Sequence, residues 1–128
     1  MESHCATGRA GFTVIELVVV LGAIAVLLSI AVPRYVRHVD HAREVALRHN
    51  LKAMRDAIDR FHADRGRHPE SLQDLVDARY LRSIPLDPLT ERFDSWQLQP
   101  AEPPEAGIRD VHSGARGSGT GGMAYAQW

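Results

Sequence analysis

The chain has 128 residues, with 15 Lys and Arg, 16 Asp and Glu, and a formal net charge of -1 at neutral pH. This length suffices for one small domain and a short additional segment. The near balance of charge argues against a nucleic-acid-binding protein, because such proteins usually carry a basic excess. The single cysteine, Cys5, cannot form a disulfide within the chain.

An apolar stretch occupies most of the N-terminal quarter. From Phe12 to Val32 every residue except Glu16 is apolar, small or hydroxylated, and Pro33 ends the run. At about 1.5 Å of rise per residue, this stretch makes a helix of roughly 31 Å, long enough to cross the core of a bilayer. Because a carboxylate in such a helix is costly in lipid, we expect that the membrane is not its only environment.

Three interpretations of this stretch compete. The first is a plain membrane anchor. The second is a cleaved secretory signal, but such signals have a basic N-terminal region and a shorter apolar core without an acid. The third rests on residues 11–16, Gly-Phe-Thr-Val-Ile-Glu, followed by the apolar run. This segment resembles the N-terminus of type IV pilins and type II secretion pseudopilins. In that family a Gly precedes the cleaved bond, a Phe becomes the first residue, a Glu follows four residues later, and a proline is common at the end of the apolar run. The matching residues here are Gly11, Phe12, Glu16 and Pro33.

The resemblance implies processing and assembly. A prepilin peptidase would remove residues 1–11 as a leader by cutting between Gly11 and Phe12, and would methylate the new amino group. The mature helix would then pack into a helical filament. There Glu16 would pair with the Phe12 amine of a neighbouring subunit and set the register, since each charge is costly alone in an apolar interior.

The resemblance also implies a location and partners. It places the chain in the bacterial inner membrane as a single-pass protein, with its C-terminal domain in the periplasm. The partners would be other pseudopilins and the inner-membrane assembly platform, with no nucleic acid. The positive-inside rule favours the opposite orientation, because Arg34, Arg37 and Arg43 follow the apolar run. We follow the resemblance.

Beyond Pro33 the helix is expected to resume as an amphipathic spine. Apolar residues recur at spacings of four and three, which predicts a buried stripe of Leu47, Leu51, Met54, Ile58 and Phe61. Gly66 is a stop signal, giving one helix of some fifty residues. Opposite charges four residues apart predict ion pairs on the solvated faces: Glu44–Arg48, Lys52–Asp56, Arg55–Asp59 and Asp56–Arg60.

The remaining residues predict a small C-terminal domain. A short helix should start at Glu70 or Ser71 with Leu72, Leu75 and Val76 inward, and Asp87-Pro88 should form a structural turn. Residues 93–99 and 108–112 alternate or are β-prone and predict two strands. The predicted fold class is α+β and pilin-like: residues 12–33 assemble or span the membrane, 34–65 form the spine, and 66–128 form a domain with a short helix and an antiparallel sheet.

No catalytic constellation is present in the sequence. Asp110, His112 and Ser113 include triad residue types but lie too close together along the chain to converge. The resembled pseudopilins carry a calcium loop near a terminal Trp, of which Asp110, Ser113 and Trp128 keep part. Arg116 stands where an acid is expected, and calcium needs six to eight oxygen ligands. We therefore expect no metal or cofactor, and a glycine-rich turn that packs Trp128 onto the sheet.

Three functions stay open at this point. The chain resembles the major, G-type pseudopilin of the type II secretion system, a structural subunit that is not an enzyme and that helps drive protein export. A type IV pilus subunit, for adhesion or DNA uptake, is the second function. Many such pilins close a C-terminal loop with a cysteine pair, which residues 12–128 lack. The third is a plain single-pass anchored module that binds a periplasmic partner without assembling.

Overall fold

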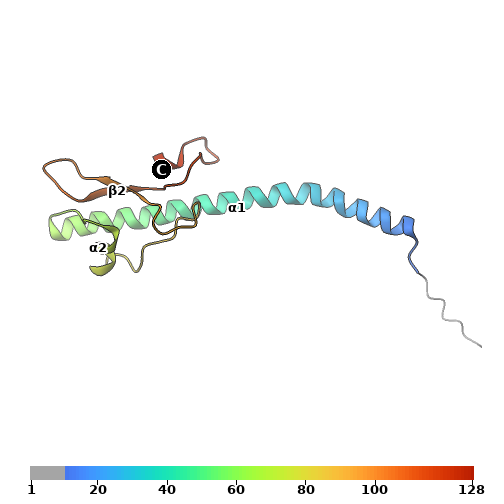
Figure 1. Cartoon of the computed structure of the whole chain (residues 1–128), viewed down its shortest axis with the longest axis horizontal. Coiled ribbons are helices and arrows are strands. Elements are labelled where there is room, and N and C mark those ends of the chain that lie inside the picture. Colours follow the sequence, from blue (N-terminus) through green and yellow to red (C-terminus); the bar gives the residue numbers. More distant parts are fainter. Residues whose placement is uncertain (1–10) are drawn as a thin grey trace, which may run out of the picture. The chain divides into compact units, whose positions relative to one another are not determined.

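The computed structural model describes residues 11–128. Cys5 and the predicted leader, except for its last residue Gly11, lie outside the described residues. The chain divides into two compact units, one ending at His38 and the other comprising Val39–Trp128. The element order is α1, α2, β1, β2 and a short 3-10 helix η1, which gives the predicted α+β, pilin-like arrangement (Figure 1).

Helix α1 spans Val14–Arg65 and contains 52 residues, which confirms the prediction of one helix of some fifty residues. Pro33 lies inside it. The helix ends where Gly66 adopts a φ of 68°, a conformation that glycine enters without steric cost. The Gly66 N–H donates to the His62 carbonyl at 2.8 Å and closes the last turn.

The second unit has one core, built on the predicted stripe of α1. The stripe residues Leu47, Leu51, Met54, Ile58 and Phe61 are all at most 2% exposed. Helix α2, Leu72–Asp77, adds Leu72 and Leu75 to this core, and β2 adds Ile108 and Val111. The α2 and β-hairpin segments thus cover the C-terminal part of α1 (Figure 1).

Helix α2 begins as predicted, because Ser71 caps it. The Ser71 hydroxyl accepts from the Asp74 N–H, and the Asp74 carboxylate accepts from the Ser71 N–H at 3.2 Å. This reciprocal capping box satisfies two main-chain donors that a helix start otherwise leaves unpaired. The ring of Tyr80, just beyond α2, meets Phe61 edge to face at 5.5 Å and fastens the connection to α1.

The sheet has two antiparallel strands, β1 (Gln97–Pro100) and β2 (Ile108–His112). The prediction of a strand from residue 93 was wrong at its start. Asp87 and Arg92 form an isolated bridge around a tight turn, and Arg92 then binds Asp94 through a two-bonded fork. These local bonds hold residues 87–94 in a turn. The alternation of apolar and polar residues does not reveal such bonds, so it predicted a strand that began too early.

Three of the four predicted ion pairs on α1 are not formed among the described residues. Lys52 and Asp56 pair at 2.8 Å, as predicted. Glu44 is instead 4% exposed and Arg55 is half-buried, so neither lies on a solvated face. Both side chains instead bind segments far along the chain. Those contacts stabilise the fold more than an exposed ion pair on the helix surface would.

Candidate functional site

The predicted cleavage site lies in exposed, non-helical chain just ahead of α1. Gly11, Phe12 and Thr13 precede the helix, and Phe12 is 85% exposed. A side chain at Gly11 would meet no atom within 4 Å, so the structure around this bond is open. A protease needs access to the bond that it cuts, and this exposed, non-helical segment provides it.

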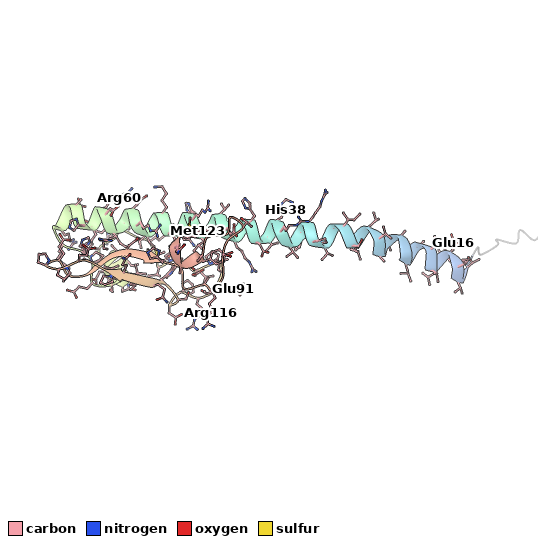
Figure 2. The ribbon with its side chains drawn as sticks, turned by 90° about the horizontal axis from the view of Figure 1, so that it is seen from above. Glu16, His38, Arg60, Glu91, Arg116 and Met123 are labelled. Atoms are coloured by element: carbon pink, nitrogen blue, oxygen red, sulfur yellow. The ribbon has the colours of Figure 1, made fainter. Side chains whose placement is uncertain are left out.

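The start of α1 is capped by the segment that contains the predicted cleavage site. The Thr13 hydroxyl accepts from the Glu16 N–H at 3.2 Å, which is half of a capping box. Glu16 lies in the first turn, where a carboxylate is favoured by the helix dipole (Figure 2). Its side chain is exposed and has no ion pair among residues 11–128.

The surface of α1 from Val14 to Val32 is apolar and uncovered. One helix among residues 11–128 is long and apolar enough to span a membrane, with an 18-residue window of mean hydropathy 2.8 and none of that window buried. Leu, Val and Ile side chains project from every side of it, many of them more than half exposed. A continuous apolar surface of this kind requires lipid or other apolar helices around it.

Pro33 marks the end of this apolar surface. Proline has no N–H, so the carbonyl one turn earlier lacks its main-chain donor. The Pro33 carbonyl itself accepts from the Arg37 side chain at 3.3 Å. Arg34 and Arg37 follow directly, and charged side chains of this length can reach the polar boundary of a membrane.

The weak calcium candidates, Asp110 and Ser113, are hydrogen-bonded to protein groups. One oxygen of Asp110 accepts from the Arg55 Nε and from the Val111 N–H, both at 2.7 Å. Ser113 is fully buried, and its hydroxyl donates to Asp87 at 2.6 Å. Because these oxygens already serve protein donors or acceptors, the residues do not fit a calcium ion, which requires six or more oxygens.

The glycine-rich tail is held by Glu44 of α1. The Glu44 carboxylate accepts from the Thr120 N–H at 2.8 Å, from the Thr120 hydroxyl at 2.7 Å and from the Tyr125 hydroxyl at 3.2 Å. The hydrogen bond from the Thr120 hydroxyl is the main reason that the pKa of Glu44 is lowered. Burial of the carboxylate acts in the opposite direction. Burial, aided by the same carboxylate, raises the pKa of Tyr125.

The ring of Trp128 packs against α1 and the tail, and its main-chain oxygen also lies 2.7 Å from His112 of β2, so the residue contacts the sheet as well as the helix. The Arg48 guanidinium lies 4.3 Å from the centre of the indole ring, a cation–π distance. A side chain at Gly119 would collide with that ring, so glycine is needed there. The Trp128 main-chain oxygen accepts from Arg55, which ties the end of the described chain to the helix.

Sequence reasoning missed the roles of Glu44 and Arg55, and a cluster of His62, His68 and Glu105. Glu44 and Arg55 were assigned to surface pairs because their partners, Thr120 and Asp110, lie 76 and 55 residues away. The one available signal was the position of Glu44, three residues before Leu47 and seven before Leu51, which places it on the same helix face as the apolar stripe. His62 and His68, with five residues between them, have a spacing found in zinc sites, but the third member, Glu105, lies 37 residues beyond His68.

An apolar helix that continues into an amphipathic spine under a small α+β domain defines a pilin-like protein. The chain is 31% identical over 96 residues to the type II secretion system core protein G of Klebsiella pneumoniae, covering 62% of this chain and 69% of that protein. It is 26% identical over 96 residues to the Pseudomonas aeruginosa protein of the same name, covering 62% and 68%. No family model matches the chain, and no solved structure matches it significantly. The chain belongs to the type II secretion system core protein G family, a family of pseudopilins.

Proposed function

We propose that this chain is a structural, non-enzymatic subunit of a type II secretion pseudopilus. In this proposal it enters the inner membrane through residues 12–33, loses its leader at Gly11, and assembles through α1 into a helical filament that drives protein export. The observation that carries the proposal is the apolar surface of Val14–Val32, uncovered on every side behind an exposed Gly11–Phe12 bond.

The charges at the start of the helix support assembly rather than simple anchoring. After cleavage, the Phe12 amine would stand one turn ahead of Glu16. Within an apolar bundle each group alone carries a large desolvation cost, which pairing between neighbouring subunits offsets. The pair therefore favours one axial register between subunits, as polar groups do in coiled coils.

The first experiment tests processing. Intact mass and N-terminal sequencing of the chain from cells with a prepilin peptidase should show a start at N-methyl-Phe12, and cells without the enzyme should show an uncut chain. Gly11→Val should block cleavage, whereas Gly22→Val, a control within the same segment, should leave it unchanged. An uncut wild-type chain in both strains would contradict the proposal and favour a plain anchor.

The second experiment tests Glu16 and separates the two filament classes. Glu16→Ala should be cut normally but should fail to assemble, as measured by filament cross-linking and by export of secreted proteins. Glu70→Gln, which changes an exposed acid elsewhere, should behave as wild type. Loss of pilus-dependent adhesion or DNA uptake with normal export would instead identify a type IV pilus subunit; the shared family name favours the secretion system.

The third experiment tests orientation. Alkaline phosphatase, which is active only in the periplasm, is fused after Trp128. We expect an active enzyme, because the family resemblance places this domain outside the inner membrane. An inactive fusion would show that Arg34, Arg37 and Arg43 determine a cytoplasmic location through the positive-inside rule.

A further inference from the structure

Two imidazoles and one carboxylate come together where α1 ends. His62 lies in the last turn of α1, His68 lies in the connection that follows, and Glu105 lies between β1 and β2. One ligand atom from each residue lies within 4.8 Å of the others, and no other such group of three occurs among residues 11–128. We propose that these residues form a binding site for a divalent transition-metal ion of the zinc class.

The carboxylate is the centre of the cluster. One Glu105 oxygen lies 2.9 Å from the Nε2 of His68, and the other lies 3.7 Å from the Nε2 of His62. In a tetrahedral zinc site with bonds of about 2.0–2.1 Å, neighbouring ligand atoms are roughly 3.3 Å apart. The observed separations, each to a different Glu105 oxygen, lie on either side of that value. Because one ligand atom from each residue lies within 4.8 Å of the others, binding an ion requires side-chain shifts of roughly 1.5 Å or less.

The donor types select the ion. Imidazole nitrogen with carboxylate oxygen suits zinc and its neighbours in the transition series, whereas calcium and magnesium prefer all-oxygen sites. Two His and one Glu leave a fourth position for water. The side chains of His62 and Glu105 are 40% and 55% exposed, so an ion can enter from solvent.

His68 supplies the fixed ligand. Its side chain is only 10% exposed, and its Nδ1 atom is buried with no hydrogen-bond partner among residues 11–128. An unpaired buried ring nitrogen costs stability, so an apolar ring would fill this position better. The polar ring is useful for its other nitrogen, the Nε2 that faces Glu105. Close packing against Gly107 holds the backbone of this residue in place.

His62 supplies the movable ligand. Its ring stacks on that of His68, with centroids 4.2 Å apart and an angle of 18° between the planes. Two parallel rings cannot both direct an in-plane lone pair at one ion. The exposed His62 ring must therefore rotate on binding, and its exposure leaves room for this rotation.

Zinc binding to the untagged full chain in detergent tests the proposal. Zn²⁺ added as a simple salt should bind with one-to-one stoichiometry by calorimetry. At tenfold excess over Kd the apparent Tm of the domain should rise by roughly 5 °C or more, whereas the same concentration of Ca²⁺ should leave it unchanged.

The variants identify the ligands. His62→Gln and Glu105→Gln change exposed side chains and should fold; each should weaken zinc binding at least about tenfold. His49→Gln and Glu102→Gln, matched controls on the same helix and the same loop, should bind as wild type. Equal affinity in wild type and Glu105→Gln, or no saturable binding up to about 1 mM Zn²⁺, would overturn the proposal and leave a hydrogen-bonded cluster only.

Discussion

Replacing Glu44 with Gln tests how the tail is attached to α1. The carboxylate accepts three hydrogen bonds, two from Thr120 and one from Tyr125. Hydrogen bonds to a charged group contribute about 1.5–3 kcal/mol each, and the Gln amide nitrogen cannot accept one. Because the Gln oxygen retains part of this set, we expect a loss of about 2–3 kcal/mol in the free energy of unfolding.

The assay is unfolding of the full chain in detergent, followed by the fluorescence of Trp96 and Trp128. For a domain of this size the expected loss lowers Tm by roughly 10–20 °C. Glu70→Gln is the control, because its carboxylate is exposed and has no hydrogen bond among the described side chains. A loss below about 0.5 kcal/mol for Glu44→Gln would refute the reasoning, since surface changes commonly fall within that range.

The pH dependence provides a second check on Glu44. Its pKa in the folded chain is lowered below the ordinary value of 4.5, chiefly by the Thr120 hydroxyl. The carboxylate therefore stabilises the fold fully above about pH 4.5, and this contribution is lost as the pH falls through the lowered folded pKa. The stability gap between wild type and Glu44→Gln should narrow in that range. A gap independent of pH would show that charge is not the cause.

Three further substitutions are expected to destabilise the same domain, measured by the same unfolding assay. Phe61→Ala should cost about 3–5 kcal/mol, because it empties a site that is 1% exposed; a loss below about 1 kcal/mol would show a collapsed core. Gly119→Ala should cost about 1–3 kcal/mol by displacing Trp128, and an unchanged Tm would mean that the ring moves freely. Arg55→Gln should cost about 1–2 kcal/mol through its bonds to Asp110, Val111 and Trp128, and additivity with Asp110→Asn would exclude direct coupling between Arg55 and Asp110.

Local periodicity predicted the helical parts of this fold well. The stripe from Leu47 to Phe61 and the caps at Ser71 and Gly66 depend on residues within a few positions of one another, and the structure confirms them. The roles of Glu44 and Arg55 depend on partners more than fifty residues away, which no local pattern encodes. The predicted start of the first strand was wrong for a related reason: the hydrogen bonds of the turn around Asp87 determine the structure there, and the alternating pattern does not encode them.

The candidate sites divide in the same way. The processing segment around Gly11 and Glu16 could be predicted from the sequence because the resemblance rests on a short contiguous pattern, and it stays a prediction. The cluster of His62, His68 and Glu105 could not, because a loop 37 residues beyond His68 supplies the third side chain. The calcium candidates, Asp110 and Ser113, were predicted from residue type alone. The sequence could not show that an oxygen of Asp110 already accepts a hydrogen bond from Arg55.

The bond between Glu44 and Thr120, separated by 76 residues, has a consequence for the order of folding. During synthesis α1 emerges long before the tail, and contacts between distant residues form late because closing a long loop costs entropy. Until Thr120 has been synthesised and bound to Glu44, the tail does not cover the N-terminal part of the apolar stripe. A chain that crosses the membrane before synthesis is complete would therefore reach the other side unfinished, and would close its domain there.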